Sequence, residues 1–124
     1  MSGNDITTEA VRLAMSMNQL RAEYASQNIS RSNTPDAKAV HLDFAHSQSL
    51  LEQVVSQKGV NEGSLLDAIA SAATSPTTSE RTDAAINLDE EVADMASANL
   101  KYQALTESLN RHFGLMRLAI TGRN

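Results

Sequence analysis

The three histidines are the residues in this sequence best suited to bind a metal ion or to transfer a proton. His41 and His46 stand five positions apart, a spacing that does not place them on one face of a helix. His112 is isolated between Arg111 and Phe113, without the neighbouring ligands that a metal site needs. We therefore interpret all three as ordinary surface histidines and expect no metal site.

An acidic run, Asp89-Glu90-Glu91, follows Asn87 closely. Neighbouring carboxylates can serve in general acid–base catalysis. Here, however, Asn87 is a good helix N-cap, and Glu90 stands three residues later, as in a capping box. Negative charge is also favoured in the first turn of a helix. Capping and the helix dipole explain the run, so we expect no catalytic role for it.

Nucleophile and cofactor motifs are missing from the sequence. The chain has no cysteine, which excludes disulfides and thiolate metal ligands, and no serine sits in the glycine frame of a nucleophile elbow. The five glycines do not form a phosphate-binding loop. We expect neither an enzyme nor a bound cofactor.

The composition is that of a small protein with a thin core. The chain has 124 residues, the length of one domain at most, with two tyrosines, two phenylalanines and no tryptophan. Much of its 41% hydrophobic share is alanine, which buries little area. Ordering the backbone costs roughly 1–2 kcal/mol per residue. We therefore expect partner subunits, including further copies of this chain, to supply part of the burial.

Charge and hydropathy exclude two classes of partner. The net charge is -5 and no basic run is interleaved with aromatics, so we expect no nucleic-acid binding. No apolar run approaches the ~20 residues that a membrane-spanning helix needs. Residues 1–8 are polar and do not resemble a secretory signal, so we expect any export to occur without a cleaved peptide.

The last third of the chain predicts one long amphipathic helix from about residue 88 to 121. A stripe along it steps by four and three residues, the spacing that keeps one face toward a neighbouring helix. The stripe consists of Leu88, Val92, Met95, Asn99, Tyr102, Thr106, Leu109, Phe113, Met116 and Ile120. We take these residues, except Thr106 and with Leu105 added, as candidate assembly contacts. The polar Asn99 and Thr106 either set the register of a buried seam or lie exposed at an irregular contact.

A second helix is predicted over about residues 5–30. Its stripe has the same spacing and consists of Ile6, Ala10, Leu13, Met17, Leu20 and Tyr24. The two stripes are complementary, so we expect the terminal helices to pair along them. Leu13, Met17, Leu20 and Tyr24 are further candidate contacts.

The middle of the chain predicts shorter elements. Residues 32–36 form a turn because Pro35 pushes Thr34 out of the helical region. An extended stretch over 39–42, a helix over about 43–57 and a weaker helix over about 65–73 follow. Residues 74–79 are small and polar and predict a flexible loop. The prediction is an all-α, extended subunit of three segments: 1–35, 36–86 and 87–124.

Two segments resemble a known family, the bacterial flagellar rod, hook and related axial proteins. Those proteins carry an Asn-Ile-Ala-Asn-Ala-(Asn/Asp)-Thr-Pro-Gly-Tyr string that is followed by an acidic–aromatic pair. The matching residues are Asn28, Ile29, Asn33, Thr34, Pro35, Asp43 and Phe44. Arg31, Asp36 and Ala37 depart from the motif, replacing its asparagine, glycine and tyrosine.

The C-terminal segment resembles more specifically the flagellar basal-body proximal rod subunit of FlgB type. The residues that carry this likeness are 87–91, Met95, 99–103 and Leu109. The motif residues Asn28, Ile29, Asn33, Thr34 and Pro35 then join the candidate assembly contacts.

The resemblance implies a structural role without a cofactor. Members pass unfolded through the flagellar type III export apparatus without peptide cleavage, and their terminal helices pair as a coiled coil in the periplasmic rod. The proximal subunit joins the membrane-ring protein and its rod adapter to the other rod subunits. The alternative reading is a soluble helical adapter or export chaperone that holds a partner helix in a groove.

Overall fold

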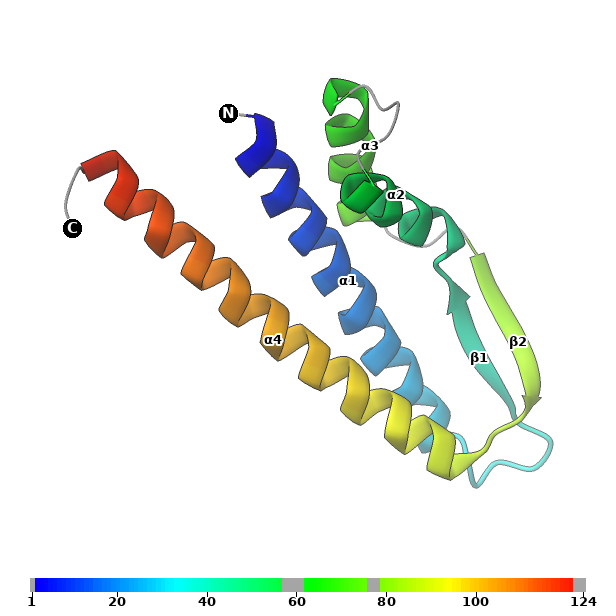
Figure 1. The fold of residues 1–124 in the computed structure, drawn as a ribbon. Helices are drawn as coiled ribbons and strands as arrows, with labels where there is room; N and C mark the ends of the chain where they lie inside the picture. The colour runs from blue at the N-terminus through cyan, green and yellow to red at the C-terminus, as the bar shows by residue number, and fades with distance from the viewer. Residues whose placement is uncertain (1, 57–61, 76–78, 122–124) are drawn as a thin grey trace.

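The computed structural model describes residues 2–56, 62–75 and 79–121, which form four helices and two strands (Figure 1). The elements in chain order are α1 (Ser2–Ser30), β1 (Lys38–Asp43), α2 (Ala45–Ser56), α3 (Glu62–Thr74), β2 (Ser79–Ala85) and α4 (Leu88–Thr121). The predicted long terminal helices and the shorter middle helices are all present. The fold is helical, as predicted, with the addition of a small sheet.

Helix α1 runs through the middle of the fold. It packs along α4 on one side and contacts α3, β1 and α2 on the other (Figure 1). Helix α4 runs antiparallel to it, so that the end of α1 lies beside the start of α4. The expected packing of the N- and C-terminal helices is confirmed.

The hydrophobic core lies between α1 and the middle helices. Its buried members are Ile6, Leu13, Met17, Phe44, Leu50, Leu65, Ile69 and Ala72. In the described part of the chain, no member of this cluster comes from α4. The prediction that the α1 stripe faces the C-terminal helix is therefore wrong for Ile6, Leu13 and Met17. Helices α2 and α3 offer α1 large aliphatic side chains, whereas the most buried α4 positions are an alanine and a glutamate.

The buried face of α4 is not quite the predicted stripe. At every second position along the stripe, the buried residue is the one just before the predicted residue. The buried or half-buried positions are Glu91, Met95, Ala98, Tyr102, Leu105, Thr106, Leu109 and His112. Apart from Thr106, which lies beside Leu105, these positions again step by four and three, but Glu91 and Ala98 replace Val92 and Asn99. The prediction assumed that polar residues such as Glu91 and His112 face solvent, so it placed the stripe on their apolar neighbours instead.

A two-stranded antiparallel sheet is formed by the strand that precedes α2 and α3 and the strand that follows them. Strand β1 pairs with β2 from Asp43↔Ser79 to Lys38↔Ala85, with an irregularity between Lys38 and Val40. The extended stretch predicted over 39–42 is confirmed by β1. The prediction that Ser79 belongs to a loop is wrong, and β2 was not predicted, because its sequence Ser-Glu-Arg-Thr-Asp-Ala-Ala lacks apolar alternation. Helices α2 and α3 are thus an insertion between two paired strands.

No helix in the described ranges combines the length and the apolar character that crossing a membrane requires. The Pro76 to Thr78 part of the predicted loop lies outside the described residues.

Candidate functional site

Asn28 is the centre of a hydrogen-bond network where α1, β1 and α4 meet. It is fully buried, and its Nδ2 donates to the Val40 carbonyl at 3.1 Å and to Glu91 Oε1 at 2.9 Å. Its Oδ1 accepts from the Val40 N–H at 3.0 Å and from Arg31 Nη2 at 2.6 Å. The amide thus uses both donors and both acceptor positions. We name the set of Asn28, Arg31, Val40, His41 and Glu91 the Asn28 junction.

Glu91 brings a carboxylate into the interior at this junction. Only 2% of the residue is exposed, and its second oxygen, Oε2, lies 3.0 Å from His41 Nε2. A buried carboxylate is strongly destabilising unless it is paired and hydrogen-bonded. Glu91 also sits in the first turn of α4, where the helix dipole favours negative charge.

The predicted N-cap of α4 is confirmed, since the Glu90 N–H donates to Asn87 Oδ1 at 3.2 Å. The interpretation of Glu91 as a capping residue alone is wrong. Its side chain reaches β1 and the end of α1, because it occupies the face of α4 that turns toward them.

His41 is not an ordinary surface histidine. It lies on β1 with 31% of its side chain exposed, and the Glu91 carboxylate contacts its Nε2. The two residues are 50 positions apart, a separation at which local spacing rules carry no information. His46 is exposed on α2, as predicted, whereas His112 is half-buried on α4 beside the Phe113 ring.

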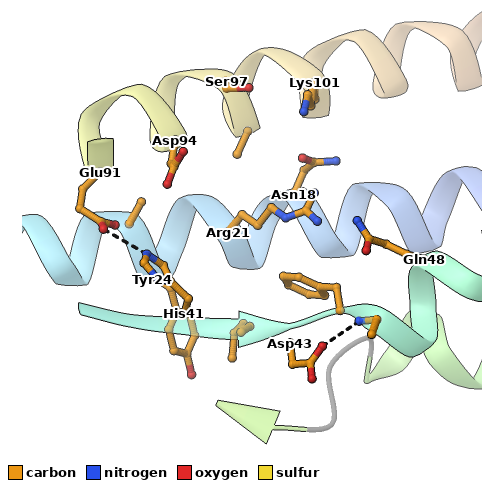
Figure 2. Close-up of a pocket in the computed structure, with 15 residues that line it drawn as sticks. Asn18, Arg21, Tyr24, His41, Asp43, Gln48, Glu91, Asp94, Ser97 and Lys101 are labelled. Carbon is orange, nitrogen blue, oxygen red and sulfur yellow. Dashed lines mark hydrogen bonds and ion pairs between the residues drawn. The ribbon is translucent and has the colours of Figure 1, made fainter. Parts of the chain in front are cut away.

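A cavity of about 500 Å³ adjoins the junction between α1, β1, α4 and the start of α2 (Figure 2). The Arg21 guanidinium lies 4.8 Å from the centre of the Phe44 ring in its wall, a cation–π contact. Burial lowers the pKa of Arg21, and the nearby Asp94 carboxylate opposes that shift. Asn18, 6% exposed, donates to the Ala14 carbonyl, while its Oδ1 has no protein partner among the described residues.

Tyr24 links α1 to the sheet. Its hydroxyl donates to Glu80 Oε1 on β2 at 2.6 Å. This hydrogen bond to the carboxylate is the main reason that the pKa of Tyr24 is raised above its usual value of 10.0, with burial and the charge of Glu80 adding to it. Tyr24 was expected to face the C-terminal helix, but its hydroxyl contacts β2.

The turn after α1 has the geometry that its motif requires. The Ala37 N–H donates to the Thr34 carbonyl at 3.2 Å, which places Pro35 and Asp36 at the two central positions of a β-turn. Asp36 has a positive φ of 61°, as expected for the third residue of a type II turn. The family motif has glycine here, and glycine adopts this conformation without steric cost. Arg31, another departure from the motif, donates to the Lys38 carbonyl at 3.0 Å and so closes the loop.

The structure distributes the predicted assembly contacts over three environments. Leu13, Met17 and Asn28 are buried, and Leu20, Tyr24 and Ile29 are half-buried. Asn33, Thr34 and Pro35 are exposed in the turn. On α4, Met95, Tyr102, Leu105 and Leu109 are half-buried, whereas Leu88, Val92, Asn99 and Phe113 are exposed. The side chains of Met116 and Ile120 lie outside the described residues.

Of the two readings left open for the polar stripe residues, exposure fits Asn99. Thr106 is half-buried and its hydroxyl donates to the Tyr102 carbonyl of its own helix at 2.9 Å.

Several large apolar side chains of α4 face solvent. They are Leu88, Val92, Leu100, Phe113, Leu115 and Leu118, with exposed fractions from 41% for Phe113 to 68% for Leu100 and Leu115. We name these six residues the α4 apolar surface. At about 100° per residue, Leu100, Leu115 and Leu118 lie on the side of α4 away from α1, whereas Leu88, Val92 and Phe113 lie nearer its α1-facing side. Both groups leave apolar area available for contacts with another molecule.

One curated protein supports a flagellar relationship. The chain is 25% identical over 132 aligned residues to the flagellar basal body rod protein FlgB of Bacillus subtilis (strain 168), with 94% of each chain covered. No family model matches the sequence. No solved structure matches the fold.

Proposed function

We propose that this protein is a structural subunit of the bacterial flagellar basal-body rod, of the proximal FlgB type. In this role it assembles helically with copies of itself and with other rod subunits, and it transmits torque between the membrane ring and the distal rod and hook. The likeness to a rod protein along 94% of both chains is the observation that carries the proposal. A fold of two long antiparallel helices suits an elongated, stacked assembly.

The α4 apolar surface supports assembly as the functional state. Its residues are exposed in the single chain, and burying them against neighbouring subunits removes apolar area from water at about 25 cal/mol per Å². Tightly packed side chains in such an interface resist deformation, which is the property that a drive shaft needs. The exposed turn residues Asn33, Thr34 and Pro35 offer a second contact region.

The proposal includes the partners and the route of this protein. They are the membrane-ring protein, its rod adapter, the neighbouring rod subunits and the flagellar type III export apparatus, which passes the chain to the periplasmic rod without peptide cleavage. The predicted division into segments 1–35, 36–86 and 87–124 belongs to this proposal. We propose that the terminal segments build the rod and that the middle segment projects from the rod.

Substitutions on the α4 apolar surface test this function. Leu100→Asp and Leu115→Asp each place a charge on a side chain that is 68% exposed, so both variants should fold. Gln103→Asp introduces the same charge at an exposed polar position of the same helix and is the matched control.

In the source bacterium, we expect the two leucine variants to abolish swimming and to leave basal bodies without a complete rod, whereas the control swims. Sedimentation of the purified parent should show association that grows with concentration and weakens in both leucine variants. A parent chain that stays monomeric, in cells that swim normally with either leucine variant, would favour the adapter or chaperone reading.

A further inference from the structure

We propose that His41, Glu91 and Asp94 form a binding site for a divalent transition-metal ion of the Zn²⁺ class. The ligands are the His41 Nε2 and one oxygen from each carboxylate. This site is independent of the proposed role in the rod. Its function is to join β1 to the first turns of α4.

The positions of the three ligand atoms fit a single ion. One ligand atom from each residue lies within 4.8 Å of the other two. Around a tetrahedral zinc ion with bonds of about 2.0–2.2 Å, neighbouring ligand atoms are roughly 3.4 Å apart. Small side-chain rotations therefore bring all three onto the ion. Glu91 and Asp94 are three residues apart on α4 and so lie on the same face of a regular helix.

Asn28 holds the buried carboxylate in the orientation that this site requires. Its Nδ2 binds Glu91 Oε1, and Oε2 is then turned toward His41. Asn28 is itself fixed by two hydrogen bonds to Val40. Metal ligands in proteins are commonly oriented by such outer hydrogen bonds. Here the orientation exists without the ion, which lowers the cost of assembling the site.

The charge of the cluster favours a cation. Glu91 is buried and Asp94 adds a second carboxylate, and the Asn28 amide supplies no positive charge. Imidazole binds a metal in its neutral form, so the proton between His41 Nε2 and Glu91 Oε2 is released to solvent when the ion binds. Arg31 donates to Asn28 Oδ1 and to the Lys38 carbonyl. The Arg21 guanidinium lies over the Phe44 ring, and its charge interacts with Asp94, so an ion at this site competes with Arg21 for that carboxylate. A divalent ion at the three ligand atoms neutralises both carboxylates at once.

The composition of the ligand set selects the metal. Zn²⁺ and its neighbours in the first transition row accept imidazole together with carboxylates, whereas Ca²⁺ and Mg²⁺ prefer oxygen ligands in larger number. All three residues line the cavity beside α1, which gives an ion a route from solvent (Figure 2). The cavity also has room for a water molecule as the fourth ligand.

The untagged full chain should bind one Zn²⁺ ion in calorimetric titration with zinc chloride, and its thermal unfolding midpoint should rise. Asp94→Asn is the decisive variant because Asp94 is exposed and lies outside the Asn28 junction, so its loss leaves that network in place. We expect it to weaken zinc binding at least tenfold while the metal-free protein still unfolds cooperatively.

Two controls separate this site from adventitious binding. His46→Ala removes an exposed histidine, and Asp89→Asn removes an exposed carboxylate of the same helix turn. Both should bind zinc like the parent, and calcium chloride should not raise the unfolding midpoint. The proposal is overturned if the parent shows no saturable zinc binding, if Asp94→Asn binds as tightly as the parent, or if His46→Ala loses the ion.

Discussion

The Nδ2 of Asn28 donates a 2.9 Å hydrogen bond to Oε1 of Glu91, and this buried contact joins residues that are 63 positions apart. It fastens the last turn of α1 to the first turn of α4. Because both helices are long, fixing them at this end also sets where their remaining turns meet. Asn28, a residue of the family motif, therefore helps to set how α1 and α4 align along their length.

Asn28→Ala should lower the free energy of unfolding by about 2–4 kcal/mol, because it removes the hydrogen-bond partner of the buried Glu91 Oε1 and of both Val40 backbone groups. Denaturant unfolding followed by circular dichroism measures the change. Asn33→Ala is the matched control, since Asn33 is exposed in the following turn and its loss should change stability by no more than about 0.5 kcal/mol. Equal effects of the two substitutions would contradict the role assigned to Asn28.

Asp36→Gly should stabilise the protein by about 0.5–1 kcal/mol, because the residue has a φ of 61° and glycine reaches this region without the steric cost of a side chain. Asp36→Val should destabilise it by a similar or larger amount. Asn33→Gly, at a turn position without a positive φ, should bring no gain. The midpoints of chemical denaturation order the variants, and a destabilised glycine variant would refute the turn assignment.

Tyr24 should make stability fall at alkaline pH. Its pKa is raised in the folded protein, so its contribution is complete below the unfolded pKa of about 10 and is lost as the pH rises through the folded value. Tyr24→Phe and Glu80→Gln should both flatten this alkaline decline. Urea unfolding at a series of pH values, with ultraviolet titration of tyrosine absorbance, tests the effect. An unchanged decline in both variants would show that another group causes it.

Leu13→Ala should cost about 2–5 kcal/mol, because the side chain is fully buried in the core that α1 forms with α2 and α3. Leu100→Ala removes the same atoms from an exposed site on α4 and should change monomer stability by less than about 0.5 kcal/mol. Both are measured by denaturant unfolding at low protein concentration. Comparable losses would mean that the α4 apolar surface is already buried in the single chain.

The helices were predictable because their ends carry local signals. Asn87 caps α4, Pro35 follows the end of α1, and apolar residues recur at helical spacing between them. Strand β2 escaped prediction since only its backbone pairing with β1 makes it a strand. Such pairing depends on a segment far away in the chain, which no local pattern describes.

The junction was predictable only in part. The resemblance to flagellar axial proteins marked Asn28, but not what it contacts. Glu91 was hidden within an acidic run that a helix start explains by itself, and His41 gave no local sign of a partner. Polar residues that are buried through distant hydrogen bonds look the same in a sequence as polar residues in solvent.

The placement of α2 and α3 between two paired strands lets residues be added to this segment without moving the terminal helices. Strands β1 and β2 are paired, so Asp43 and Ser79 lie side by side where the segment between them begins and ends. This arrangement does not depend on the number of residues between them. Relatives of this protein could therefore enlarge this segment, as insertions between adjacent chain ends are tolerated, and still present the same helical pair to a shared assembly, provided that they keep the α2 and α3 side chains that form the core with α1.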